Sequence, residues 1–155
     1  MLRHLAAQQR PRLDIEVDSA GTADYHIGAA PDARSQRAAL RRGIDLSGMR
    51  ARQVTADDFA RFDFILAMDR ENLRELEALK PDGSRAKVKL FLDYAPRADA
   101  PHPGSLEVPD PYYGGDADFE RVLDLAAAAS RGFLDSLQER SQQPVEAAGE
   151  RDGHR

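Results

Sequence analysis

The segment of the sequence that is richest in groups able to do chemistry is 110–120, which reads DPYYGGDADFE. Pro111 disfavours helical backbone at Asp110 and holds that residue extended, so one carboxyl group is presented on a constrained loop. This position suits a general acid, which must reach the leaving atom and carry a proton near the working pH. The adjacent Tyr112 and Tyr113 can form the wall of a slot for a flat ring. Asp-Pro turns and surface tyrosines are also common without any catalytic role, so composition alone leaves both interpretations open.

The 155-residue sequence contains no cysteine. Disulfides, thiolate zinc sites, iron–sulfur clusters and a cysteine nucleophile are therefore excluded within these residues. Asp116 and Asp118 fit a helix cap better than a calcium loop. The histidines also lack the spacing of metal ligands, and they are His4, His26, His102 and His154. We therefore expect neither a metal nor a cofactor.

Three short stretches have the pattern of β-strands. Apolar and acidic residues alternate over 13–17, which predicts a strand with one buried face. The apolar run FDFILAM at 62–68 is short enough to favour a central parallel strand that is buried on both faces. Alternation over 87–92 predicts the third strand.

Helical periodicity and capping residues account for most of the other segments. Pro31 at the start and Gly43 at the end bound one helix, and Asp69 caps another. The expected helices cover 2–9, 31–42, a short segment from Thr55, 70–79 and 116–140. A proline-rich loop spans 93–115, and the polar stretch 141–155 is expected to be a disordered tail.

Strands that alternate with helices predict an α/β fold with a parallel sheet, here in one domain over 1–140. Parallel sheets bind ligands at the carboxyl ends of their strands. The residues at those ends are 19–22, Met68 with Asp69, and the loop after Leu92. Polar side chains there are better functional candidates than polar side chains elsewhere.

The charge balance bears on possible partners. The chain has 22 basic and 27 acidic residues, whereas proteins that bind nucleic acid through its phosphates are usually basic. Residues 34–52 contain six arginines and one aspartate, and 110–124 contain five acidic residues and one arginine, a pattern typical of solvated helix faces. The sequence has no signal-peptide pattern at its start and no stretch near the ~18 apolar residues of a membrane span. We expect a cytoplasmic protein with no nucleic-acid or membrane partner.

Several collinear motifs resemble those of the low molecular weight protein-tyrosine phosphatase family. The most specific of them is 110–120, and the resemblance extends over about residues 1–140. The others are DSAGT at 18–22 with Tyr25 following, GAAPDAR at 28–34, Gly43-Ile44, ARQV at 51–54, and Met68-Asp69 with Asn72-Leu73. The resemblance implies a three-layer α/β sandwich with a short parallel sheet and helices on both faces.

The resemblance also implies an activity, which is hydrolysis of phosphotyrosine or another aryl phosphate through a phosphocysteine intermediate. By position, Asp110 is similar to the family's general acid, which protonates the leaving phenol oxygen and then activates water. The side chains that are similar to the walls of the aryl slot are Tyr25, Tyr112 and Tyr113. Ser19 and Asp69 resemble residues that brace the phosphate loop, although capping of strand ends explains them equally well. The implied partner is a phosphotyrosine protein or a small aryl phosphate.

The family's first strand, which is interior to its sheet, and the Cys-x5-Arg loop after that strand have no counterpart here. Residues 1–5 resemble the later part of the family's first helix. Neighbouring strands are then expected to have unpaired backbone groups, each of which costs about 1–3 kcal/mol when buried. We therefore expect the 155-residue chain neither to hydrolyse nor to bind aryl phosphates tightly. We also expect the reading frame to begin further upstream and to encode a longer, active protein.

Three alternatives follow from the same residues. The chain is a truncated pseudo-phosphatase or an interaction module if the upstream frame is closed. A thioredoxin-coupled arsenate reductase shares the fold but needs additional cysteines to relay a disulfide, and the sequence has none. Nucleic-acid binding through the arginines of 34–52 predicts an affinity that falls steeply with salt.

Overall fold

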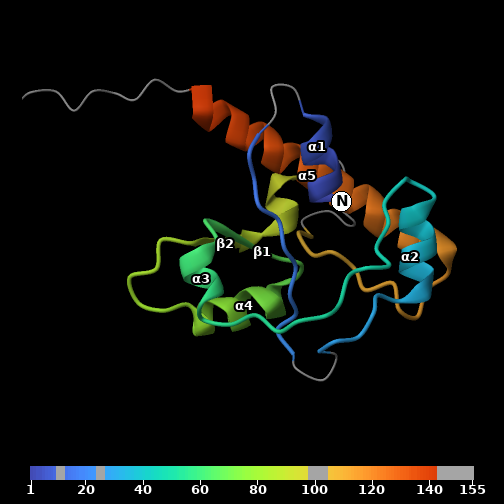
Figure 1. Ribbon diagram of the computed structural model, residues 1–155, viewed down its shortest axis with the longest axis horizontal. Helices are drawn as coiled ribbons and strands as arrows, with labels where there is room; N and C mark the ends of the chain where they lie inside the picture. The colour runs from blue at the N-terminus through green and yellow to red at the C-terminus, as the bar shows by residue number, and fades with distance from the viewer. Residues whose placement is uncertain (10–12, 24–26, 98–104, 143–155) are drawn as a thin grey trace, which may run out of the picture.

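The computed structural model describes residues 1–9, 13–23, 27–97 and 105–142 (Figure 1). The elements in chain order are α1 (Leu2–Gln8), α2 (Ala33–Leu40), α3 (Asp58–Arg61), β1 (Phe64–Ala67), α4 (Arg70–Leu79), β2 (Lys87–Leu90), the 3₁₀ helix η1 (Phe91–Tyr94) and α5 (Asp116–Gln142). No helix in the described part of the chain is both long and apolar enough to cross a bilayer.

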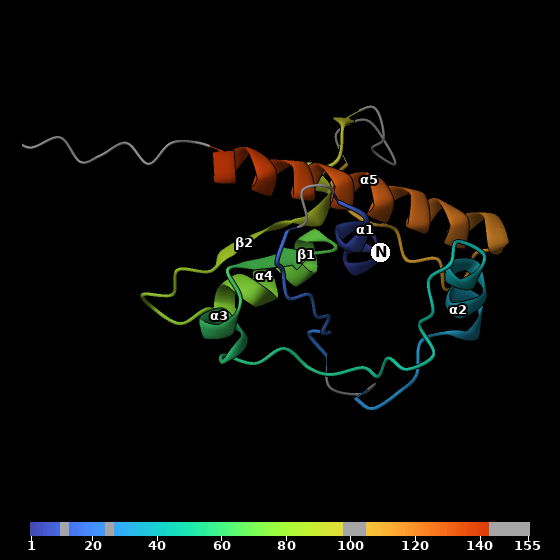
Figure 2. The same cartoon turned by 45° about the horizontal axis from the view of Figure 1, so that its top comes forward.

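The sheet is formed by β1 and β2, which pair in parallel with Phe64 opposite Lys87 and Ala67 opposite Leu90. Helix α4 connects the two strands, which makes a βαβ unit. Figure 2 shows α5 crossing one face of this sheet while α3 and α4 lie on the other face. The predicted α/β class, parallel sheet and three-layer arrangement are confirmed.

Two apolar cores hold the layers together, one on each face of the sheet. The first lies between the sheet and the α3–α4 layer and consists of Phe59, Ala67, Leu76, Ala86 and Leu90. The second lies between η1 and α5 and consists of Phe91, Leu92, Leu125 and Ala129. Because β2 runs directly into η1, the two cores meet at Leu90 and Phe91, and α5 is fixed relative to the strand ends.

Helix α5 approaches the η1 backbone closely at Gly132. A Cβ atom built on Gly132 would lie 1.8 Å from the carbonyl oxygen of Tyr94, so only glycine fits there. On the next residue, the Phe133 ring packs edge-to-face against both Phe64 and Tyr94, with ring centroids 5.1 Å apart in each pair. This contact sets the depth at which α5 sits on the sheet.

The predicted helices are present with small differences in length. Asp32 caps α2 by accepting a hydrogen bond from the Arg34 amide, and Asp69 caps α4 by accepting one from the Asn72 amide at 2.7 Å. The second helix ends at Leu40, and Gly43 beyond it has a φ of 78°. Helix α5 continues through Gln142, two residues into the segment predicted to be a tail, whose other residues lie outside the described ones.

The predicted strand at 13–17 is wrong. Within the described residues, no backbone–backbone hydrogen bond joins 13–18 to another segment, and the sole bridge near it pairs Gly21 with Gln53. A strand needs a neighbour for its alternate amides and carbonyls, and β1 pairs only with β2 in the described sheet. The alternating pattern therefore produces an extended segment without a ladder.

The other two strands are shorter than predicted and lie in a different environment. Only Ala67 of β1 is buried, and its other three residues are half-buried, so the prediction of a strand buried on both faces is wrong. A two-stranded sheet leaves one edge of β1 without a strand, which exposes part of its apolar surface. The run predicted over 87–92 leaves the ladder after Leu90 and tightens into η1.

Candidate functional site

Three loops meet where β1 ends, which is the edge at which parallel sheets bind ligands. The Val108 amide donates to the carbonyl oxygen of Met68 at 2.8 Å, and the Arg70 amide donates to Oε1 of Glu107 at 3.0 Å. The Asn72 side chain donates to Thr22 Oγ1 at 3.3 Å. These bonds bring the loops 19–23, 68–72 and 105–110 to one end of the sheet.

Asp110 lies exposed on the last of these loops, two residues beyond the bond that ties Val108 to β1. Its Oδ1 accepts a hydrogen bond from the Tyr112 amide at 3.0 Å, which closes a tight turn around Pro111. The second carboxyl oxygen of Asp110 has no hydrogen bond to any residue the structure describes. That oxygen is available to a ligand.

The two tyrosines of the motif stand out from the surface. Tyr113 is 97% exposed and Tyr112 is 57% exposed, and their rings meet edge-to-face with centroids 4.9 Å apart. Two exposed rings side by side provide a surface against which a flat ring can pack. The pair provides an aromatic surface on the same loop as Asp110.

The main anchor of this loop is Arg34 on α2, which belongs to the arginine-rich segment 34–52 and was not predicted to contact the loop. Its Nη2 donates to the Tyr112 carbonyl at 2.8 Å, and its Nη1 lies 3.5 Å from the Gly114 carbonyl. The guanidinium also lies over the rings of Tyr112 and Phe119, at 5.6 and 4.8 Å from their centroids. The loop is therefore tied to α2 as well as to β1.

Ser19 and Asp69, the two residues that resemble those bracing a phosphate loop, lie in different surroundings. Asp69 is the cap of α4, as described above, and is half-buried at the end of β1. Ser19 is exposed, and its amide donates to Oδ1 of Asp18 at 2.8 Å. No hydrogen bond in the described structure joins either residue to Asp110. The predicted site residue Tyr25 lies outside the described residues.

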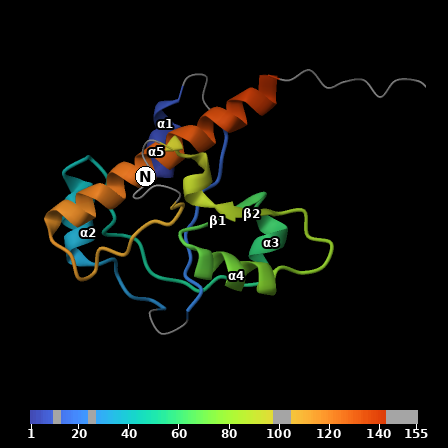
Figure 3. The same cartoon turned by 180° about the vertical axis from the view of Figure 1, so that it is seen from behind.

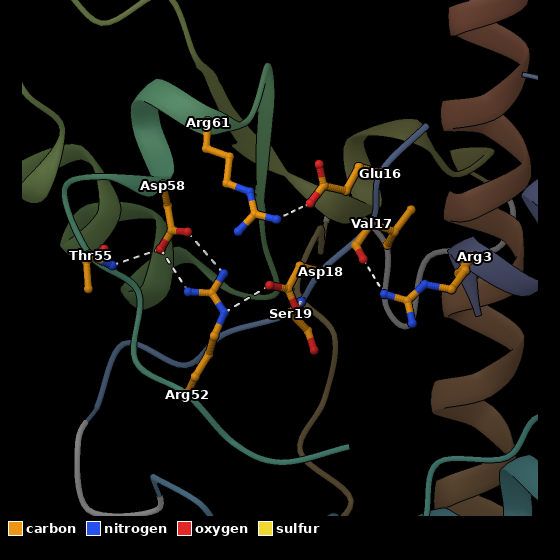
Figure 4. Close-up of polar contacts among 9 residues, drawn as sticks. All are labelled: Arg3, Glu16, Val17, Asp18, Ser19, Arg52, Thr55, Asp58 and Arg61. Atoms are coloured by element: carbon orange, nitrogen blue, oxygen red, sulfur yellow. Dashed lines mark hydrogen bonds and ion pairs between the residues drawn. The ribbon is translucent and has the colours of Figure 1, made fainter. Parts of the chain in front are cut away.

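A second set of polar contacts fixes the segment that contains Asp18 and Ser19 (Figure 4). Arg52 donates from Nε to Asp18 and from both terminal nitrogens to the buried Asp58, at 3.0 and 3.1 Å. Asp58 also accepts a hydrogen bond from the Thr55 amide. Arg61 pairs with Glu16, and Arg3 donates to the Val17 carbonyl. Side chains thus replace the strand ladder that this segment lacks.

The paired charges shift the protonation equilibria of this network. The hydrogen bonds from Arg52 lower the pKa of Asp58 despite the burial of its carboxyl group, and the same bonds raise the pKa of Arg52. Both groups therefore remain charged through the neutral range. No cluster of three or more potential metal ligands occurs among the described residues.

The basic and acidic segments noted in the sequence face each other, rather than being two separate solvated faces. Arg41 and Arg42, which directly follow α2, both pair with Glu120 on α5, and Arg42 also pairs with Asp124 at 2.8 Å. The hydrogen bonds from Arg42 and Arg41 lower the pKa of Glu120. Figure 3 shows α2 beside the N-terminal end of α5. The opposite net charges of 34–52 and 110–124 are the sequence signal that could have indicated this contact, but they were interpreted as solvated helix faces.

The comparisons with known proteins agree with this geometry. The family model for low molecular weight phosphotyrosine protein phosphatases matches residues 1–143. The low molecular weight phosphotyrosine protein phosphatase of Homo sapiens is 40% identical over 137 residues, which cover 87% of this chain and 82% of that protein. The low molecular weight protein-tyrosine-phosphatase YfkJ of Bacillus subtilis is 37% identical over 142 residues, covering 92% and 86%.

A solved structure supports the same relationship. The crystal structure of a protein tyrosine phosphatase from Entamoeba histolytica superimposes with a TM-score of 0.80 at 31% identity, covering 90% of this chain and 86% of that one. The parallel sheet, the loops at its end and the matched sequence together define an α/β protein of the phosphatase class. The chain belongs to the low molecular weight phosphotyrosine protein phosphatase family.

Proposed function

We propose that this chain carries the proton-donating and aryl-binding half of a protein-tyrosine phosphatase site. Asp110 is the general acid in this proposal, and Tyr112 and Tyr113 form one wall of the slot for the phenyl ring. The observation that carries the proposal is the turn at Pro111, which places a carboxyl oxygen without a hydrogen bond in the described structure beside two exposed rings. The substrate class is an aryl phosphate, of which phosphotyrosine is the protein-borne example.

In this proposal Asp110 acts on the leaving group. The protonated carboxyl group gives its proton to the phenol oxygen as the phosphorus–oxygen bond breaks, and the resulting carboxylate then accepts a proton from the attacking water. The bond from the Tyr112 amide fixes one oxygen, so the other faces the substrate. Stacking against the tyrosines orients the aryl ring for this transfer.

The nucleophile is the part of the reaction that these 155 residues do not supply, since they contain no cysteine. We propose that the chain by itself does not turn over aryl phosphates through a phosphocysteine intermediate. Ser19 and Asp69 lie in the strand-end loops where they would brace a phosphate loop. The alternative, a non-catalytic interaction module, retains the same tyrosines as its contact surface.

A fusion protein tests the assignment of Asp110. A strand and Cys-x5-Arg loop taken from a family relative are joined ahead of Met1, and p-nitrophenyl phosphate hydrolysis is measured. We expect activity that falls by about 10²–10⁴-fold in Asp110→Asn, the usual contribution of a general acid. Asp116→Asn is the matched control, because Asp116 is also exposed at the end of the same loop. Equal activity of the Asp110 and Asp116 variants would remove Asp110 from the mechanism.

The unfused chain tests the second part of the proposal. We expect no p-nitrophenyl phosphate turnover above the buffer rate. Turnover that disappears in Asp110→Ala would show that these residues contain a complete site with another nucleophile. Translating the DNA upstream of the Met1 codon gives an independent check, because an open frame that encodes Cys-x5-Arg predicts an active longer protein and an immediate stop codon predicts the interaction module.

A further inference from the structure

The loop that carries Asp110, Tyr112 and Tyr113 has few contacts of its own. Its internal hydrogen bonds are the Asp110 turn and a bond from the Gly114 amide to the Pro111 carbonyl at 2.8 Å. Asp110, Tyr112 and Tyr113 are all exposed, so no apolar core holds this stretch. A loop with such contacts is expected to open at low free-energy cost unless another element restrains it.

The restraint comes from Arg34, the second residue of α2. Its guanidinium donates to the carbonyl oxygens on both sides of Tyr113, those of Tyr112 and Gly114, and it covers one face of the Tyr112 ring. On the other side it packs over Phe119, which is 4% exposed and belongs to the first turn of α5. Arg34 therefore connects α2, the loop and α5 at one point.

Asp32 fixes the direction in which Arg34 points. The Asp32 carboxylate accepts from Nε of Arg34 at 3.3 Å and from Nη2 at 3.1 Å, and it also caps α2 through the Arg34 amide. The hydrogen bond with Asp32 raises the pKa of Arg34 and so keeps its charge. A planar group with five donors can serve a carboxylate and two carbonyls at once, whereas a lysine ammonium cannot match that geometry.

We propose that Arg34 is a positioning residue for the general acid and the aryl slot. It holds the Tyr112 peptide by its carbonyl, and the amide of the same residue holds Asp110. Loss of the Arg34 bonds therefore releases the acid and the aromatic wall together. This role rests on the proposed function for its catalytic meaning, but the positioning itself is a property of the free protein.

Backbone ¹⁵N relaxation of the full 155-residue chain tests the assignment. We expect order parameters near those of a rigid backbone, about 0.85, at residues 112–114 of the wild type and a fall to about 0.6 or lower in Arg34→Gln. Arg34→Lys is expected to restore less than half of the difference, because it lacks the planar fork. The melting temperature of both variants is expected to stay within about 2 °C of the wild type, since the bonds are exposed.

Arg41→Gln is the matched control, because it removes the arginine at the C-cap of the same helix, which pairs with Glu120 and has no hydrogen bond to the loop in the described structure. We expect wild-type order parameters at 112–114 in this variant. Unchanged order in Arg34→Gln, full restoration by lysine, or an equal loss of order in Arg41→Gln would each overturn the proposal. So would a loss of order spread evenly over the chain with a lower melting temperature, because it would indicate general destabilisation.

The same measurement separates this inference from the proposed function. A loop that loosens in Arg34→Gln while the fusion protein shows no dependence on Asp110 would leave the positioning role intact and remove the catalytic one. If the activity of the fusion protein depends on Asp110 while the loop stays rigid in Arg34→Gln, the catalytic role of Asp110 stands and the positioning role of Arg34 does not.

Discussion

Two regions of the molecule are held by arginine side chains in different ways. In the acid-bearing region, defined here as α2, residues 105–115 and α5, the arginines add to helix packing and to an apolar core. In the strand-edge region, defined as 13–23 with 50–61, the arginines hold an extended segment that lacks a backbone ladder. Arginine side chains therefore add to helix packing in the acid-bearing region, whereas in the strand-edge region they replace a backbone ladder.

The difference has an energetic consequence. An exposed ion pair contributes about 0–1 kcal/mol, so the pairs that fix Glu16 and Asp18 restrain their segment weakly. The buried contact of α5 with η1 involves close-packed rings and a glycine that admits no side chain. The strand-edge region should therefore open well before the acid-bearing region does.

Amide hydrogen exchange provides the largest test of this contrast. We expect amides of 13–17 to exchange about 10³-fold faster than those of β2 and central α5, which corresponds to about 4 kcal/mol of opening free energy. The physical reason is that the first group has no backbone acceptor in the described structure. Equal protection in both groups, measured by mass spectrometry or NMR, would show that the extended segment is part of a stable ladder in solution.

Gly132→Ala is expected to weaken the acid-bearing region most. The added methyl group would overlap the Tyr94 carbonyl, so α5 must shift from η1 at a cost of about 3 kcal/mol in the free energy of unfolding. Urea denaturation measures this loss. Ala128→Gly is the control: it removes a methyl group from the same helix instead of adding one, and helix propensity alone should lower the free energy of unfolding by about 1 kcal/mol. A cost at Gly132 no larger than that would contradict the close contact.

Asp58→Asn is expected to break the strand-edge region. The asparagine amide has one oxygen, so it can accept from only one of the two terminal nitrogens of Arg52, and it has no negative charge to balance the guanidinium. We expect the free energy of unfolding to fall by about 2 kcal/mol at neutral pH. Because the folded pKa of Asp58 is lowered, its contribution is fully present above the unfolded value of about 3.9 and is lost as pH falls through the folded pKa. The free energies of unfolding of the wild type and of Asp58→Asn should therefore converge as the pH falls below about 4.

The neighbouring Asp57 supplies the control for this substitution. Asp57→Asn changes the same charge one residue away, where the side chain makes no capping hydrogen bond, and should alter stability by less than about 0.5 kcal/mol. A gap between wild type and Asp58→Asn that persists unchanged at pH 3 would show that the effect is not electrostatic.

Tyr94→Phe is expected to give the smallest effect, and the effect is stabilising. The Tyr94 hydroxyl is buried with no hydrogen-bond partner in the described structure, so its removal should add about 1 kcal/mol. Burial also raises the pKa of Tyr94, so wild-type stability declines as pH rises through that raised value, and the variant escapes this loss. Tyr113→Phe, at a fully solvated ring, should leave stability unchanged. Destabilisation by Tyr94→Phe would indicate a partner for the hydroxyl.

Local sequence signals predicted the helices and the constrained turn at Asp110 well, because their determinants are local. Asp69 caps α4 and Pro111 shapes the turn at Asp110 within a few residues of chain. The strand at 13–17 was wrong because alternation records which side chains can be buried, but not whether a partner strand is present. The burial of β1 was overestimated for the same reason.

The residues missed in the sequence act across long separations. Arg34 reaches Tyr112, and Arg42 reaches Glu120, and neither pair has a local pattern that distinguishes it from solvated charge. The buried Asp58 belongs to a capping motif, which concealed its bidentate pairing with Arg52. Such contacts become visible only when the fold brings the segments together.

The packing of α1 against α5 also sets an order of events during synthesis. Gln9, which follows α1, accepts a hydrogen bond from the Gln138 side chain near the end of α5, and the two helices lie side by side in Figures 1 and 2. At about 5–20 residues per second, the ribosome needs several seconds or more to reach α5 after it has made α1. During that interval the Ala6 face of α1 has no docking surface on α5. Helix α1 therefore cannot complete its packing until α5 has been made, and a chain released before α5 would leave the Ala6 face uncovered.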